Sequence, residues 1–126
     1  MTENSNEQAT PGCRLYGIRN CDTMKKALAW CDAHDIAYEF HDYKKLGVPR
    51  DRLVAWCRAA GWKTLLNTRG PTFRKLPPER QQIDTQSAAV ALMVEFPSAI
   101  KRPVVETASG QLLVGFDAAM FESFVR

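Results

Sequence analysis

The sequence predicts an α/β fold, and three observations support this class. A chain of 126 residues with 45% hydrophobic and 25% charged side chains is long enough for one core and too short for two. Short apolar runs of strand length occur near both ends, and segments with helical periodicity fill the middle. We expect a single domain over residues 13–126, after a disordered tail over residues 1–12 that has no aromatic or branched apolar side chain.

The first elements form a predicted strand–helix–strand unit. Residues 13–18 (CRLYGI) are an apolar run that ends in a polar turn, which is typical of a buried strand. Apolar side chains then recur at intervals of three and four from Met24 to Cys31, as on one face of a helix. Residues 36–43 alternate well enough for a second strand, so the two strands are predicted to be parallel.

The middle of the chain is predicted to be helical. A second helix begins near Pro49 and ends at Gly61. Residues 65–80 contain Gly-Pro and Pro-Pro pairs and are predicted as a loop, with a short helix beginning near Pro77. Residues 85–97 form a further predicted helix that the terminal proline ends.

The last elements are a predicted hairpin and a helix. Residues 102–107 and 111–116 flank a short loop that contains glycine, which is the pattern of a β-hairpin. Residues 117–125 are predicted to be a helix capped by Asp117. This order, β-α-β, then helices, then β-β-α, is that of a thioredoxin-like domain with a helical insertion.

Composition argues against several classes of protein. The formal charge is +3, and the mixed acidic and basic residues predict no direct nucleic-acid partner. There is no apolar run of membrane-spanning length, and the polar N-terminus lacks the features of a signal peptide, so a cytoplasmic protein is expected. The four cysteines form no CxxC pair and lie near no histidine at zinc-ligand spacing, so we expect free thiols and no metal site.

Cys21 is the candidate nucleophile. It lies between the first strand and the first helix, where free backbone N–H groups and the helix dipole stabilise a thiolate. The alternative is that Cys21 is only a small residue in a tight turn. Cys31 and Cys57 lie on the apolar faces of helices and are predicted to be core residues. Cys13 is predicted as core too, although its place beside the tail favours partial exposure and pairing with another thiol.

A nucleophilic thiolate needs positively charged partners, and three residues are candidates. Lys25 is one helical turn beyond the cysteine, Arg69 lies in a Gly/Pro-bounded loop, and Arg102 immediately precedes a proline at a strand start. Each has an ordinary alternative, a solvated helix face for the lysine and surface charge for the arginines. His34 and His41 have no partner at useful spacing and are predicted to be surface residues.

Three segments resemble those of a known family. The segments YGIRNCDTMKKA, LLNTRGPTFRKL and IKRPVVE, in this order and with these intervals, are similar to the ArsC/Spx/YffB family, and within it to YffB-type ArsC-related proteins. The resemblance covers about residues 13–125. It implies a thioredoxin-like fold with a central mixed β-sheet flanked by helices and an inserted helical subdomain. It also implies one reactive cysteine, Cys21, opposite the Arg102–Pro103 backbone, with Pro103 in the cis form.

The sequence departs from the arsenate reductases of this family. Those proteins carry a histidine four residues before the cysteine and an arginine four residues after it, where this chain has Gly17 and Lys25. Two of their three anion-binding arginines match Arg69 and Arg102, and the third matches Gly115. Efficient reduction of arsenate is therefore not expected.

The resemblance implies a glutathione-dependent thiol reductase. Cys21 would be its only nucleophile, and Lys25, Arg69, Arg102 and Pro103 would bind an anionic group or glutathione itself. Glutathione would be the co-substrate, with no bound cofactor, and glutaredoxin is a further candidate partner of a monomeric protein.

An alternative function is that of an Spx-like, non-catalytic regulator that binds RNA polymerase. Regulators of that type usually carry a CxxC switch. In this chain Met24 stands three residues after the first cysteine, so a two-cysteine switch cannot form there.

Overall fold

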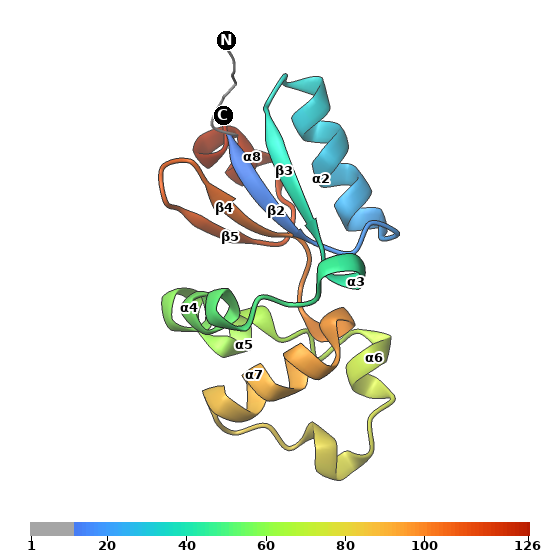
Figure 1. Cartoon of the computed structure of the whole chain (residues 1–126). Coiled ribbons are helices and arrows are strands. Elements are labelled where there is room, and N and C mark those ends of the chain that lie inside the picture. The colour runs from blue at the N-terminus through green and yellow to red at the C-terminus, as the bar shows by residue number, and fades with distance from the viewer. Residues whose placement is uncertain (1–11) are drawn as a thin grey trace. The chain divides into compact units, whose positions relative to one another are not determined.

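The computed structural model describes residues 12–126, which form two units (Figure 1). One unit comprises the chain up to His41 together with Arg102–Arg126, and the other comprises Asp42–Lys101. The predicted helical insertion is thus the second unit. That the two units fold as one domain stays a prediction.

The predicted tail lies outside the described residues except for Gly12. The N–H group of Gly12 donates to the Ala37 carbonyl over 2.6 Å, and the Gly12 carbonyl accepts from the Ala108 N–H over 3.1 Å. The described backbone therefore begins one residue before the predicted domain boundary.

The first unit contains a mixed four-stranded sheet of order β3-β2-β4-β5 and two helices. Strand β4 is antiparallel to both β2 and β5, and helix α2 connects β2 to its other neighbour, β3. This agrees with the predicted α/β, thioredoxin-like fold. The elements are β2 (Cys13–Gly17), α2 (Asp22–Ala33), β3 (Tyr38–Asp42), β4 (Val104–Thr107), β5 (Leu112–Val114) and α8 (Ala118–Phe124).

Apolar faces of α2 and α8 share one core with the sheet. The predicted face of α2 is correct, because Met24, Ala27 and Cys31 are completely buried. Cys13 lies in the same core and is 2% exposed, so its prediction as a core residue is confirmed and the partial exposure that its place beside the tail favoured is not found. The physical reason is strand periodicity, since Cys13 and Leu15 point to the same side of β2 and face the helix.

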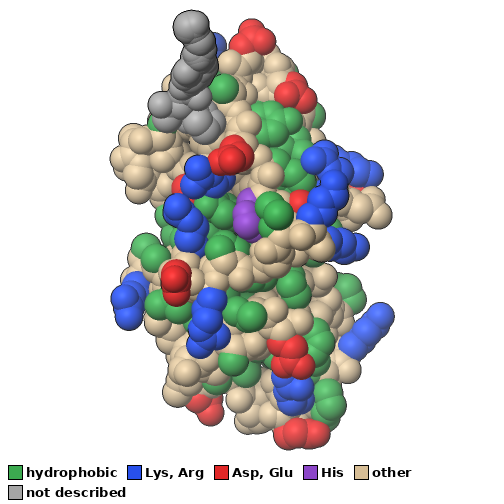
Figure 2. Space-filling model, viewed as in Figure 1, with side chains coloured by type: hydrophobic (Ala, Val, Ile, Leu, Met, Phe, Trp, Pro, Cys, Tyr) green, Lys and Arg blue, Asp and Glu red, His purple; other side chains and the backbone are tan. Residues whose placement is uncertain are grey.

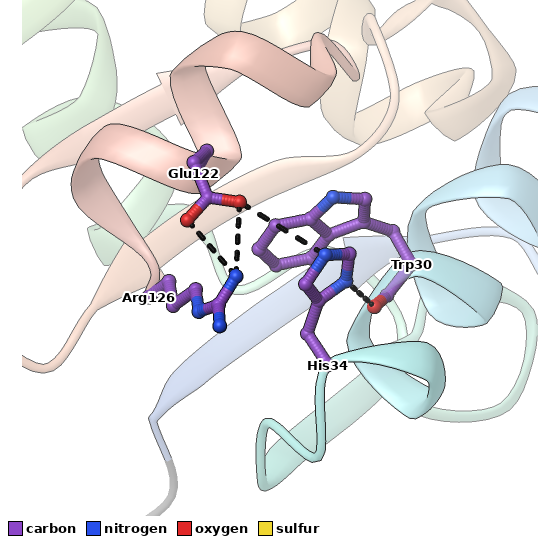
Figure 3. Close-up of polar contacts among 4 residues, drawn as sticks. All are labelled: Trp30, His34, Glu122 and Arg126. Carbon is purple, nitrogen blue, oxygen red and sulfur yellow. Dashed lines mark hydrogen bonds and ion pairs between the residues drawn. The ribbon is translucent and has the colours of Figure 1, made fainter.

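Helix α8 is attached to α2 by aromatic rings and by polar contacts at the surface (Figure 3). The ring of Phe121 meets the Trp30 ring edge-on at a centroid distance of 5.3 Å. His34 stacks on Trp30 at 4.1 Å, and its Nδ1 lies 2.8 Å from the Trp30 carbonyl oxygen. Its Nε2 lies 3.9 Å from a carboxylate oxygen of Glu122, which also accepts from Arg126.

The two histidines are partly exposed, but the prediction that they have no partner is wrong. His34 has the contacts just described, and His41 lies with its ring 5.2 Å from that of Tyr16. The Trp30 contact of His34 has the spacing of one helical turn, whereas spacing does not reveal the other two contacts. The Glu122 and Tyr16 partners come from elements far along the chain from each histidine.

The second unit is helical, as predicted. The helix that Pro49 precedes and the helix capped by Thr85 are both present, and the Thr85 hydroxyl accepts from the Ala88 N–H over 3.1 Å. A short 3₁₀ helix follows Pro77, as expected, whereas a turn of α-helix from Pro71 to Arg74 was missed in the predicted loop. The helices are α3 (Tyr43–Leu46), α4 (Arg50–Ala60), α5 (Trp62–Leu65), α6 (Pro71–Arg74), η1 (Pro78–Gln81), α7 (Gln86–Glu95) and η2 (Pro97–Ala99).

Within residues 12–126, none of the helices combines the length and the apolar character that crossing a membrane requires.

We predict that the aromatic contacts, and not the ion pairs, hold α8 in place. Phe121→Ala should lower the free energy of unfolding by about 3–5 kcal/mol, because it empties a completely buried ring site. Glu122→Gln should change it by about 0.5 kcal/mol or less, because that carboxylate is half exposed. Urea-induced unfolding of the three proteins measures both, and equal losses would contradict this assignment.

Candidate functional site

Cys21 occupies the N-cap position of α2. Its backbone is extended, with φ −150° and ψ 131°, and its carbonyl accepts the first helical hydrogen bond from the Lys25 N–H over 2.9 Å. The thiol makes no capping hydrogen bond of ordinary geometry, but the N–H groups of Thr23 and Met24 are close enough to stabilise a thiolate. The sulfur is therefore half-buried at a helix N-terminus, as its place in the sequence predicted.

Arg102 is the charged partner of this sulfur. Burial raises the pKa of Cys21, but the Met24 N–H, the Arg102 guanidinium and the Thr23 N–H together outweigh burial, so the pKa lies below its ordinary value. The guanidinium acts both as a hydrogen-bond donor and as a positive charge. Arg102 and Cys21 are 81 residues apart in the sequence. They lie close in space because β4, which follows Arg102, pairs with β2, which precedes Cys21.

The Arg102–Pro103 peptide bond is cis, as the resemblance implied. Pro103 is buried, and its carbonyl accepts a hydrogen bond from the Gly115 N–H over 2.8 Å. Arg102, Pro103 and Cys21 all belong to the first unit.

The other three thiols lie in less reactive surroundings. A hydrogen bond with Cys31 and burial both raise the pKa of Cys13, and burial raises the pKa of Cys57. The hydrogen bond with Cys13 lowers the pKa of Cys31, but all three thiols are at most 2% exposed. Because a thiol reacts as its accessible thiolate, we expect Cys21 to be the most reactive of the four.

Lys25 and Arg69 are not placed at the sulfur by any described contact. The Lys25 side chain is exposed on α2, although its backbone bonds to Cys21. Arg69 is exposed in the second unit, where its N–H donates to Asn67 Oδ1 over 3.2 Å. Their roles as ligands of an anionic group stay predictions.

Gly17 and Met24 form a packing pair beside the site. A Cβ atom on Gly17 would lie 2.6 Å from the sulfur of Met24, whose side chain is completely buried. A side chain at position 17, where arsenate reductases carry histidine, would therefore have to displace the Met24 side chain. The glycine at position 17 and the methionine at position 24 are coupled by this packing contact.

Gly115 has a conformational reason to be glycine. Its φ of +89° lies in the region that residues with a Cβ rarely adopt. An arginine at this position would strain the backbone that bonds to Pro103, so its absence here follows from the local turn.

No group of three or more His, Cys, Asp or Glu side chains within residues 12–126 is arranged to hold a metal ion.

Comparisons with known proteins point to one family. The sequence profile of the ArsC family matches residues 16–124. A solved structure of a YffB protein is 46% identical, covers 90% of this chain and 99% of its own, and superposes with a TM-score of 0.86. An arsenate reductase (ArsC) related protein from Brucella melitensis is 43% identical, with 91% and 95% covered and a TM-score of 0.71. The global transcriptional regulator Spx of Streptococcus mutans is 24% identical over 113 residues, 88% of this chain and 81% of the regulator.

We predict that Gly17→Ala destabilises the fold by about 1–3 kcal/mol, because the added methyl group overpacks against Met24. The control is the same substitution in a Met24→Ala background, where the smaller side chain leaves room and most of this extra cost should vanish. Chemical denaturation of the wild type, the two single variants and the double variant gives the coupling energy between positions 17 and 24. Additive losses would show that the two side chains do not compete for space.

We also predict that Cys21 reacts with iodoacetamide at pH 6.5 well before the other three thiols. Arg102→Gln should slow this reaction about tenfold, because loss of a charge-assisted hydrogen bond raises the pKa of Cys21 and leaves less thiolate at that pH. The rate profile of the variant should shift to higher pH. Mass spectrometry of each cysteine peptide measures the rates.

The matched control is Arg126→Gln, which removes an exposed arginine of the same unit. An equal loss of rate in both variants would mean that net charge, and not the contact of Arg102 with the sulfur, activates Cys21.

Proposed function

Because the chain belongs to the ArsC family, we propose that it is a thiol oxidoreductase in which Cys21 is the single nucleophile and glutathione supplies the second thiol. The observation that carries the proposal is the surroundings of one sulfur. It is accessible at a helix N-terminus, and two N–H groups and a guanidinium lower its pKa. The other three thiols are buried, which favours a mechanism with one protein cysteine.

The reaction would proceed through a mixed disulfide. The Cys21 thiolate attacks one sulfur of a disulfide substrate, the Cys21–sulfur bond forms, and the other half of the substrate leaves as a thiolate. A glutathione thiolate then attacks the substrate sulfur bound to Cys21, so that Cys21 leaves as a thiolate and a mixed disulfide of substrate and glutathione forms. A second glutathione thiolate attacks the glutathione sulfur of that mixed disulfide, the substrate leaves as a thiolate, and two glutathione molecules are thus oxidised to one disulfide for each substrate disulfide reduced.

Positive groups would orient the glutathione. Arg102 is already at the sulfur and is suited to a carboxylate or to the leaving thiolate. We propose that Lys25 and Arg69 bind the carboxylates of the tripeptide and that the peptide bond before Pro103 binds its peptide groups. No bound cofactor is required, and glutaredoxin is the candidate partner for recycling. Reduced glutathione is abundant in the cytoplasm, which is where the proposal places a monomeric protein.

Arsenate is the less favoured substrate. Its oxygens carry one to two negative charges that several converging arginines would neutralise, and this chain has glycines at two of the positions that the family's arsenate reductases use. Met24 fills the space at Gly17, and the positive φ of Gly115 opposes any other residue there. We therefore expect weak arsenate reduction.

The second candidate function is that of a non-catalytic regulator, because an Spx protein is among the relatives. Binding of the purified protein to the RNA polymerase α subunit, unchanged in Cys21→Ser, would favour it.

The test of the enzymatic proposal is incubation with oxidised glutathione followed by mass spectrometry of the whole protein. We expect one glutathione adduct that is absent in Cys21→Ser, forms about tenfold more slowly in Arg102→Gln, and is unchanged in the control Cys57→Ser. An adduct that persists in Cys21→Ser would move the chemistry to another thiol. Efficient arsenate turnover would contradict the order of substrates.

A further inference from the structure

The two units carry opposite formal charge. Residues Asp42–Lys101 contain eleven Lys and Arg against five Asp and Glu, a formal charge of +6, whereas the rest of the chain contains six against nine. The expectation of evenly mixed charge is thus wrong for the insertion. Figure 2, viewed as Figure 1, shows Lys and Arg side chains on the visible face of this unit. A surplus of this size attracts acidic partners.

The positively charged unit contains a pocket of about 280 Å³. Its inner wall includes Leu66 and Phe73, which are 2% and 6% exposed, while Lys63 and Thr68 on its wall are exposed. The lining residues come from α5, the loop after it, α6 and the segment around η1. They are Trp62, Lys63, Leu66, Thr68, Phe73, Gln81 and Ile83.

Polar and charged groups surround the apolar wall. The Lys63 ammonium lies 5.6 Å from the centre of the Trp62 ring and remains exposed. Arg74 and Lys75 directly follow Phe73 and are exposed as well. The Gln81 amide donates to the Leu76 carbonyl over 2.9 Å, which holds one side of the pocket. The pocket therefore combines apolar lining residues with one positively charged lining side chain, Lys63, and two further exposed basic residues follow Phe73 in the chain.

We propose that this pocket binds an acidic segment of a partner protein, which inserts one aromatic or branched aliphatic side chain. The volume is slightly below the roughly 300–1,000 Å³ of typical small-molecule sites and is suited to one side chain. A buried apolar anchor with charged pairs at the rim is the usual arrangement of a protein interface. Carboxylates beside the anchor would pair with Lys63, Arg74 and Lys75, and the pairing would accelerate association.

A nucleic acid is the competing polyanion, and the apolar interior argues against it. Phosphates would use the positive charge but would leave the partly exposed apolar surface of Trp62 and Ile83 uncovered. The proposal shares no residue with the Cys21 site, so it stands or falls independently of the thiol chemistry.

The test is a titration of the full-length, ¹⁵N-labelled protein, followed by NMR. The probe is a short acetylated peptide with one phenylalanine between acidic residues on both sides. We expect shifts that cluster at the pocket, including the Trp62 indole N–H signal. A peptide with alanine in place of phenylalanine, and one with lysines in place of the acidic residues, should each bind at least fivefold more weakly.

Two charge-reversal variants form a matched pair. Lys63→Glu should weaken binding of the acidic phenylalanine peptide about fivefold or more, whereas Lys45→Glu, which changes the net charge equally at an exposed site outside the pocket, should have a much smaller effect. Equal effects would overturn the proposal in favour of unspecific attraction. It would also be overturned if a single-stranded DNA oligonucleotide shifted the same pocket signals, or if no peptide shifted them.

Discussion

The site depends on how closely the end of β2 approaches the first turn of α2. Gly17 and the buried Met24 sulfur lie so close that a Cβ on Gly17 would be 2.6 Å from the sulfur, and the Met24 side chain fills this space. This packing joins the end of β2 to the first turn of α2. The N-terminus of α2 in turn carries Cys21, so the place of the reactive sulfur follows from packing in the core.

Activation of the sulfur combines local and distant groups. The N–H groups of Thr23 and Met24 are supplied by the helix that Cys21 caps, whereas the Arg102 guanidinium is supplied by a segment that pairs with β2 from the other end of the chain. Burial works against the thiolate and these groups outweigh it. The site is suited to a sulfur that must be charged, accessible and close to a fixed positive charge.

The departures from arsenate reductases are built into the fold. Gly17 is required by the methionine beside it, and Gly115 by its own backbone conformation and its bond to Pro103. A single substitution toward the reductase pattern at either position would therefore disturb packing or a turn. The charge is also divided unevenly, with a positive formal charge on the insertion and a negative one on the rest of the chain.

The sequence by itself determined the order of the strands and of the longer helices, the capping residue Asp117, and the place of Cys21 at a helix start. These are local properties, because periodicity, caps and turns depend on residues a few positions apart. Resemblance to the family supplied the cis Arg102–Pro103 bond, which no local pattern required.

Tertiary structure alone decided which side chains meet. Cys13 is buried although it follows the tail, because its side chain lies on the side of β2 that faces α2. His34 lies near Glu122 because α8 packs against α2. The contact of Arg102 with Cys21 and the closeness of Gly17 to Met24 were likewise not readable from spacing. Each of these contacts depends on how strands and helices pack around a shared core. That packing leaves no local pattern in the sequence.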